Sequence, residues 1–141
     1  MSKWSSIITM LSFLSIFGGA SAQSLGPDDL TADAALAMAN KGEIIIIDVR
    51  TPEEWKQTGV PENAKAIALN NPAFLNVLNE AINNDKTKPI ALICRTGNRS
   101  GHAQKQLAGM GFTNVKNIKE GMAGSSGGPG WLKRGLPLRQ P

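Results

Sequence analysis

The 141-residue chain has one cysteine, one histidine and no tyrosine. A single cysteine excludes an internal disulfide, even in an oxidising compartment where disulfides persist. One cysteine and one histidine are also too few ligands for a typical structural metal cage, so we expect neither a metal site nor a cofactor. The sequence contains no nucleophile elbow, and this argues against a Ser–His–Asp hydrolase.

Charge of either sign is also scarce. The 15 lysines and arginines exceed the 11 acidic residues by only four. An excess this small, with no basic run, gives no support to a nucleic-acid partner.

A long apolar run is missing as well. The apolar stretch over residues 7–17 is shorter than the roughly 20 residues that a membrane-spanning helix needs. Ala20-Ser21-Ala22 then has the small-x-small pattern of signal peptidase sites, which predicts cleavage before Gln23. We expect a signal peptide over residues 1–22, one folded domain over 23–141, a periplasmic or secreted location, and no stable membrane insertion after cleavage. The alternative is a segment that is retained as an anchor.

The remaining chain alternates between strand and helix patterns. Four consecutive isoleucines within residues 43–49 show no polar alternation, which is typical of a strand covered on both faces in a parallel sheet. Similar short strands are expected within residues 24–30 and at 65–69, 90–94 and 114–118. Helical patterns lie between these strands, so a parallel α/β sheet is the predicted fold class.

Capping signals set the expected helix starts. Thr31 can cap a first helix, and Thr51 with Pro52 and Glu54 has the pattern of a capping box. A third helix is expected to start at Asn71-Pro72. The glycine- and serine-rich residues 121–130 predict a surface loop, and Trp55, Trp131 and Leu132 are expected to pack into the core.

The only cysteine stands at the end of the apolar strand at residues 90–94. Ligands of parallel sheets bind at the carboxyl ends of strands, where Cys94 lies. The polar turn Arg95-Thr96-Gly97-Asn98-Arg99 follows and leads into a helix. Inward backbone amides, the positive helix start and two guanidinium groups would each favour a thiolate, the reactive form of cysteine. The alternative is an inert thiol buried at a strand end.

Residues 94–100 resemble the active-site loop of the rhodanese domain, the thiosulfate sulfurtransferase family. Further stretches resemble family landmarks in the correct order: residues 44–55 (IIIIDVRTPEEW), 59–64 (GVPENA), 109–115 (GMGFTNV), 120–121, Trp131 and 135–137. The resemblance covers residues 28–138. It departs from the family pattern at Val60, where histidine is common, and at the insertion over residues 125–130. It implies a single rhodanese-like domain with a parallel five-stranded sheet and helices on both faces.

The resemblance implies a sulfurtransferase of the exported bacterial type with Cys94 as the catalytic residue. The thiolate would take the outer sulfur of thiosulfate or a similar small anionic donor, and a persulfide would pass it to a thiol, cyanide or possibly a protein thiol. The expected substrate-binding residues are Arg95, Thr96, Gly97, Asn98 and Arg99. Arg95 and Arg99 would orient the anionic donor, and Gly97 would allow the tight turn.

Two other functions stay open. One is a persulfide carrier or sulfur-binding module that acts with protein partners. The other is a phosphatase-like or arsenate-reductase-like activity, which the loop disfavours: four residues separate Cys94 from Arg99, one fewer than in those enzymes.

Several other polar residues are candidates for a chemical role. His102 is interpreted as a helix-surface residue rather than a partner of Cys94. By resemblance, four charged residues are expected to form ion pairs that brace a strand-to-helix turn: Asp48, Arg50, Glu53 and Glu54.

Overall fold

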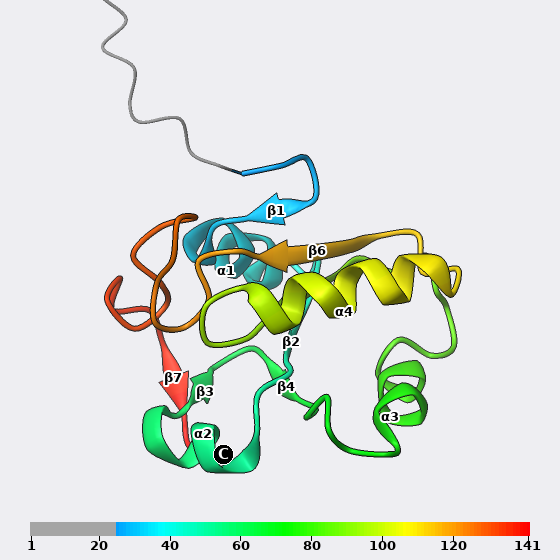
Figure 1. Ribbon diagram of the computed structural model, residues 1–141, viewed down its shortest axis with the longest axis horizontal. Helices are drawn as coiled ribbons and strands as arrows, with labels where there is room; N and C mark the ends of the chain where they lie inside the picture. The colour runs from blue at the N-terminus through cyan, green and yellow to red at the C-terminus, as the bar shows by residue number, and fades with distance from the viewer. Residues whose placement is uncertain (1–24) are drawn as a thin grey trace, which may run out of the picture.

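The computed structural model describes residues 25–141, so the predicted signal peptide lies outside the described residues (Figure 1). Five parallel strands form the main sheet in the order β1-β6-β5-β2-β4. They are β1 (Asp29–Leu30), β2 (Ile45–Asp48), β4 (Lys65–Ala66), β5 (Ile90–Ile93) and β6 (Val115–Ile118). The predicted α/β fold with a five-stranded parallel sheet is confirmed.

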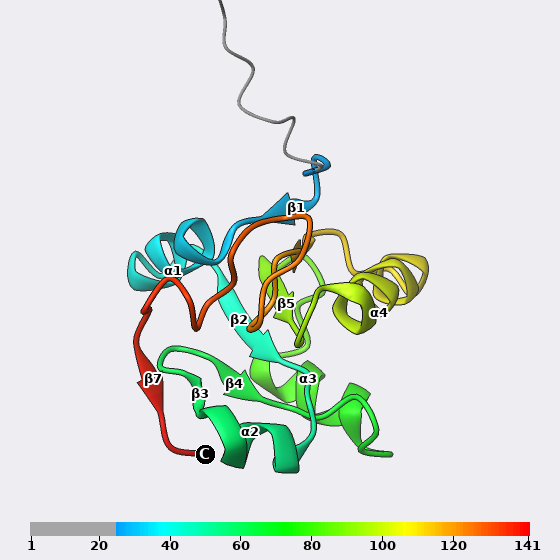
Figure 2. The same cartoon turned by 60° about the vertical axis from the view of Figure 1, so that its left-hand side comes forward.

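Four helices connect these strands: α1 (Ala32–Asn40), α2 (Pro52–Thr58), α3 (Phe74–Ala81) and α4 (Asn98–Gly109). Figure 2 shows α1 and α4 on opposite sides of the sheet. None of the helices within residues 25–141 is long and apolar enough to cross a membrane.

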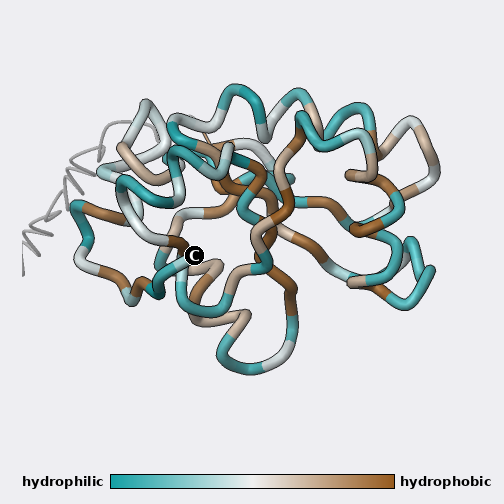
Figure 3. Tube along the Cα trace, turned by 90° about the horizontal axis from the view of Figure 1, so that it is seen from below, coloured by the Kyte–Doolittle hydropathy of each residue, from teal (hydrophilic) through white to brown (hydrophobic). Residues whose placement is uncertain are grey.

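The apolar core consists of two layers that share the central strand β5. Ile90 and Leu92 face one layer, which contains the buried residues of α3 and α4. Ala91 and Ile93 face the other, which contains α1 and the fully buried Trp131. Figure 3 shows stretches of hydrophobic residues, coloured brown, running through the middle of the domain. Side chains alternate along a strand, so the next residue, Cys94, lies on the α3 and α4 side with Leu92.

The predicted helix caps are confirmed for α1 and α2. The Thr31 side chain accepts a hydrogen bond from the backbone N–H of Ala34, and Thr51 forms a complete capping box with Glu54. The third helix begins later than Asn71-Pro72, at Phe74. Asn71 forms a turn instead, because its side-chain oxygen accepts the N–H of Ala73 at 2.9 Å.

Two features of the second half of the chain differ from the sequence expectations. A short antiparallel pair of β3 (Val60–Pro61) and β7 (Leu138–Arg139) joins the C-terminal end to the region after α2, and no pattern in the sequence predicted it. Leu132 is 36% exposed and does not pack into the core, whereas Trp131 is fully buried as expected.

The predicted surface loop at residues 121–130 is also only partly a surface feature. We call residues 120–131 the closing segment. Met122 is 1% exposed and Glu120 is fully buried. The Glu120 carboxylate accepts backbone N–H groups of Ala32 and Gly130 and the Nε–H of Arg134. This buried carboxylate folds the glycine-rich chain back onto the domain, an arrangement that composition alone cannot reveal.

Candidate active site

Cys94 directly follows β5, at the carboxyl end of the sheet. Its thiol is free, and the residue is only 1% exposed. Two groups donate hydrogen bonds to its sulfur: the backbone N–H of Gly97 at 3.1 Å and the hydroxyl of Ser100 at 3.2 Å. The sequence predicted inward amides throughout the turn, and the structure gives this bond from Gly97.

Ser100 is a functional candidate that the sequence reasoning missed. It is fully buried in the first turn of α4, six residues after the cysteine. The sequence did contain a clue to this role, because Ser100 is a polar residue at the start of the helix that follows the cysteine. Its hydroxyl can stabilise negative charge on the Cys94 sulfur in the same way as a backbone amide.

Gly97 is required by the shape of the turn. It precedes α4 with φ of 90°, and a Cβ at this position would lie 2.1 Å from the carbonyl oxygen of Lys119. This left-handed conformation and this close approach together exclude any other residue. The role predicted for Gly97 in the turn geometry agrees with its conformation.

The closing segment supports the cysteine turn from behind. The backbone N–H of Met122 donates to the Cys94 carbonyl at 2.9 Å, and the N–H of Ala123 donates to the Arg95 carbonyl at 2.8 Å. A Cβ on Gly121 would lie 2.4 Å from that Arg95 oxygen, so a glycine is needed there too. The closing segment therefore packs directly against the backbone of the cysteine turn.

Arg99, predicted to bind the donor, is paired with Glu54 of α2. Two of its nitrogens contact the carboxylate at 2.7 and 2.8 Å. Hydrogen bonding to Arg99 lowers the pKa of Glu54 to about 2, and the same bond raises the pKa of Arg99 above its ordinary value. The pair is thus charged on both sides at neutral pH.

The support role predicted for Asp48 and Arg50 is confirmed. Both side chains are buried, and the Arg50 guanidinium binds the Asp48 carboxylate at 2.8 and 3.0 Å. The guanidinium also donates hydrogen bonds to the Thr58 hydroxyl and the Gly59 carbonyl, each at 2.9 Å. This pair fixes α2 to the end of β2. Glu53 is exposed on α2 and forms no ion pair among residues 25–141, so the supporting role expected for it is wrong.

A hollow of about 620 Å³ lies over this region. Its walls combine charged residues of both strand-to-helix turns with one apolar residue of the closing segment and one that follows it: Arg50, Glu54, Arg95, Arg99, Met122 and Leu132. Asp48 neutralises Arg50 and Glu54 neutralises Arg99. Arg95 is exposed and has no ion pair among the interactions of residues 25–141. Among these arginines, Arg95 is therefore the available cation.

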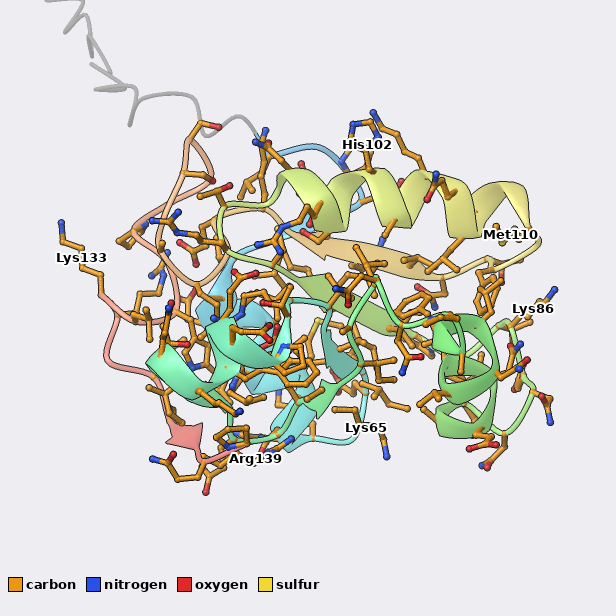
Figure 4. All side chains as sticks on the ribbon, turned by 60° about the horizontal axis from the view of Figure 1, so that its bottom comes forward. Lys65, Lys86, His102, Met110, Lys133 and Arg139 are labelled. Carbon is orange, nitrogen blue, oxygen red and sulfur yellow. The ribbon has the colours of Figure 1, made fainter. Side chains whose placement is uncertain are left out.

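The other predicted loop residues lie at the surface of the turn. Thr96 is half-buried and Asn98 is exposed. Asn98 and His102 border a second hollow, which Asn117 of β6 also lines. His102 is exposed, as expected, and points away from the body of the domain (Figure 4). Across residues 25–141, no group of three or more histidine, cysteine or acidic side chains is arranged to hold a metal ion.

Comparison with known proteins places this geometry in a family. A family model described as the rhodanese-like domain matches residues 31–126. The uncharacterized protein RP600 of Rickettsia prowazekii is 36% identical over 102 residues, which cover 65% of this chain and 80% of that protein. The thiosulfate sulfurtransferase GlpE of Pseudomonas syringae is 29% identical over 89 residues, with 63% and 77% coverage.

Solved structures agree with the sequence comparisons. The polysulfide-sulfur transferase homodimer of Wolinella succinogenes is similar with a TM-score of 0.60 and 31% identity, covering 79% of this chain and 77% of that one. The fold, the cysteine turn and these similarities lead to one conclusion: the chain belongs to the rhodanese-like domain family, with a role in sulfur transfer or sulfur carriage.

Proposed function

We propose that this protein is an enzyme that moves a sulfane sulfur from thiosulfate, or a similar small anionic donor, to a thiophilic acceptor through a persulfide on Cys94. The observation that carries the proposal is the pair of hydrogen bonds to the Cys94 sulfur from Gly97 and Ser100. Donors aimed at a sulfur stabilise the negative charge that a nucleophilic thiolate needs.

In the first half-reaction the Cys94 thiolate attacks the outer sulfur of thiosulfate. A bond forms between Sγ and this sulfur while the sulfur–sulfur bond of the donor breaks. Sulfite leaves with the bonding electron pair, and the enzyme holds a persulfide anion. No proton is transferred and no external oxidant is needed, so this half-reaction does not require a general base.

In the second half-reaction an acceptor such as cyanide or a thiolate attacks the outer sulfur. The new bond joins acceptor and sulfur, and the Cys94 thiolate leaves as the persulfide bond breaks. The donors on Sγ now stabilise the leaving group. Both half-reactions therefore use the same two hydrogen bonds, and the kinetics would be ping-pong.

Arg95 is the residue that we propose for attracting the donor. It lines the hollow beside the cysteine turn, and its charge is not neutralised by a neighbouring carboxylate within the described chain. Thr96, Gly97 and Asn98 complete the proposed substrate-binding turn. We place Arg99 there as well, in a lesser role, because Glu54 already occupies two of its nitrogens.

A steady-state assay with thiosulfate and cyanide tests the proposal. We expect thiocyanate formation, sulfite release and ping-pong kinetics. A protein that is folded and reduced but releases no sulfite from thiosulfate would contradict the proposed donor. Persulfide transfer that occurs only with a protein partner would instead favour the carrier function.

We also propose that the protein is exported and cleaved before Gln23, on the basis of the Ala20-Ser21-Ala22 pattern. N-terminal sequencing of the expressed protein tests this location. Exported protein that still begins at Met1 in a membrane fraction would replace it with the anchored alternative.

A further inference from the structure

Asn117 lies at the carboxyl half of β6, next to the cysteine turn, and is 5% exposed. Its amide Nδ2 donates to the Gly97 carbonyl at 3.2 Å, and its Oδ1 lies 2.6 Å from the Ser100 hydroxyl. Turning the amide over would bring Oδ1 against the Gly97 oxygen. The carbonyl oxygen of Asn117 is therefore held toward Ser100 as a hydrogen-bond acceptor.

Ser100 consequently faces two acceptors with one proton. The Asn117 oxygen is 2.6 Å away and the Cys94 sulfur is 3.2 Å away. A hydroxyl donates a single hydrogen, so it can bind only one of them at a time. A bond to the sulfur leaves the Ser100 and Asn117 oxygens facing each other without a proton between them, in a buried site where such a contact is costly.

We propose that Asn117 is a positioning residue that competes with the Cys94 sulfur for the Ser100 proton, and thereby favours the persulfide over the free thiolate. The proposal rests on the proposed function. Asn117 itself does not contact the sulfur in the hydrogen-bond network, and it acts through Ser100.

The preference follows from where the charge lies in each state. In the thiolate the full charge is on Sγ, which then needs the Ser100 proton. In the persulfide the charge moves to the outer sulfur, and Sγ becomes a neutral, weak acceptor. Ser100 is then free to bind Asn117. The thiol can also coexist with this bond, because its S–H can donate to the Ser100 oxygen.

The charged residues on the elements around Cys94 stay the same in the test variants. They are Arg95 in the turn; Arg99, His102 and Lys105 on α4; Asp48 and Arg50 at the end of β2; Glu54 on α2; Lys116 on β6; and Lys119 and Glu120 after β6. Any change in the ionisation of the sulfur must then come from the hydrogen-bond network.

The chain is well suited to a direct measurement of that ionisation. It has one cysteine and no tyrosine, so the ultraviolet absorbance of a thiolate reports Cys94 without interference from tyrosinate. Titration by absorbance does not need the buried sulfur to be accessible to a reagent. It also needs no sulfur donor, so it remains informative if the proposed sulfur transfer fails.

We expect Asn117→Leu and Asn117→Ala to move the midpoint of this titration to lower pH by about half a unit or more, the equivalent of a hydrogen bond of ordinary net strength. Ser100→Ala should move it to higher pH, and adding Asn117→Leu to Ser100→Ala should have no further effect. Gln104→Ala is the matched control: it removes another amide between α4 and β6, bonded to the Val115 carbonyl, and should leave the midpoint unchanged.

A second readout follows the persulfide itself. At a fixed ratio of thiosulfate to sulfite, the persulfide fraction of Asn117→Leu should correspond to a loading equilibrium about threefold or more below wild type, in line with the same shift. A titration midpoint that is unchanged or higher in both Asn117 variants, with the folded state intact by circular dichroism, would overturn the proposal. A lowered midpoint without any persulfide formation would retain the competition for the proton and overturn only the sulfurtransferase function.

Discussion

Two neighbouring strands of the sheet end in turns of opposite character. In the turn after β2 the polar groups bind one another: Thr51 and Glu54 cap α2, and Asp48 binds Arg50. The turn after β5 starts α4 without any side-chain cap, at Gly97. There the amide of Gly97 and the hydroxyl of Ser100 are directed at the Cys94 sulfur.

This difference separates a structural turn from the turn for which we propose a chemical role. Both turns lie at the same edge of the sheet and are joined by the ion pair of Glu54 and Arg99. A helix start whose donors are satisfied internally has none to offer a ligand, whereas an uncapped start retains them for an anion or a thiolate. Substitutions in the first turn should therefore reduce stability, and those in the second should reduce sulfur transfer.

The largest expected effect is at the reactive turn. Cys94→Ser should abolish formation of thiocyanate from thiosulfate and cyanide while the protein stays folded, because a serine hydroxyl is not ionised at neutral pH. The assay is paired with circular dichroism of the same sample. Activity near the wild-type level would mean that another group carries the sulfur.

The next effect is at the structural turn. Asp48→Ala removes the partner of a buried guanidinium and should lower the free energy of unfolding by about 3–5 kcal/mol. Urea denaturation measures this loss. Lys116→Ala breaks an exposed ion pair with Asp28 and serves as the control, with an expected change of at most about 1 kcal/mol. Equal losses in the two variants would contradict the structural role of the buried pair.

The two turn arginines should differ in their effect on the donor. Arg95→Ala should reduce kcat/KM for thiosulfate by roughly ten- to a hundred-fold, as expected for loss of a charge-assisted bond. Arg99→Ala should have a smaller effect, because Glu54 already neutralises this arginine. Steady-state kinetics with varied thiosulfate show which of the two variants loses more kcat/KM. A larger loss for Arg99→Ala would show that the ion pair opens to receive the donor.

The smallest expected effect is a loss of stability at acidic pH. The pKa of Glu54 is about 2, below its ordinary value of 4.5, because Arg99 donates hydrogen bonds to the carboxylate. Its contribution to stability is therefore fully present above pH 4.5 and is lost as pH falls toward 2. The pair is partly exposed, so we expect at most about 1 kcal/mol.

Thermal unfolding of the wild type and of Glu54→Gln, measured from neutral pH down to acidic pH, tests the direction of this change in stability. The wild type should be the more stable protein near neutral pH, and the difference should shrink as the solution becomes more acidic. A difference that grows on acidification would contradict the assignment.

Sequence patterns were sufficient where short-range chemistry decides the structure. The isoleucine run predicted β2, and Thr51, Pro52 and Glu54 predicted the start of α2. The position of Cys94 at a strand end followed from the strand pattern and placed it at the ligand-binding edge. These features depend on neighbours along the chain, which a sequence displays directly.

Features made by distant segments could not be predicted in this way. The closing segment was interpreted as a surface loop, because its composition does not reveal that Glu120 binds the start of α1. The pairing of Arg99 with Glu54 joins residues 45 positions apart. Asn117 likewise reaches Ser100 only because β6 lies beside β5 in the sheet.

The central claim is that Cys94 carries the transferred sulfur, and intact-mass analysis after brief treatment with thiosulfate tests it most directly. The account predicts that the mass rises by one sulfur atom, that cyanide removes it, and that Cys94→Ser shows no gain. A folded wild-type protein that gains no sulfur, or a Cys94→Ser variant that gains as much as wild type, would contradict the account.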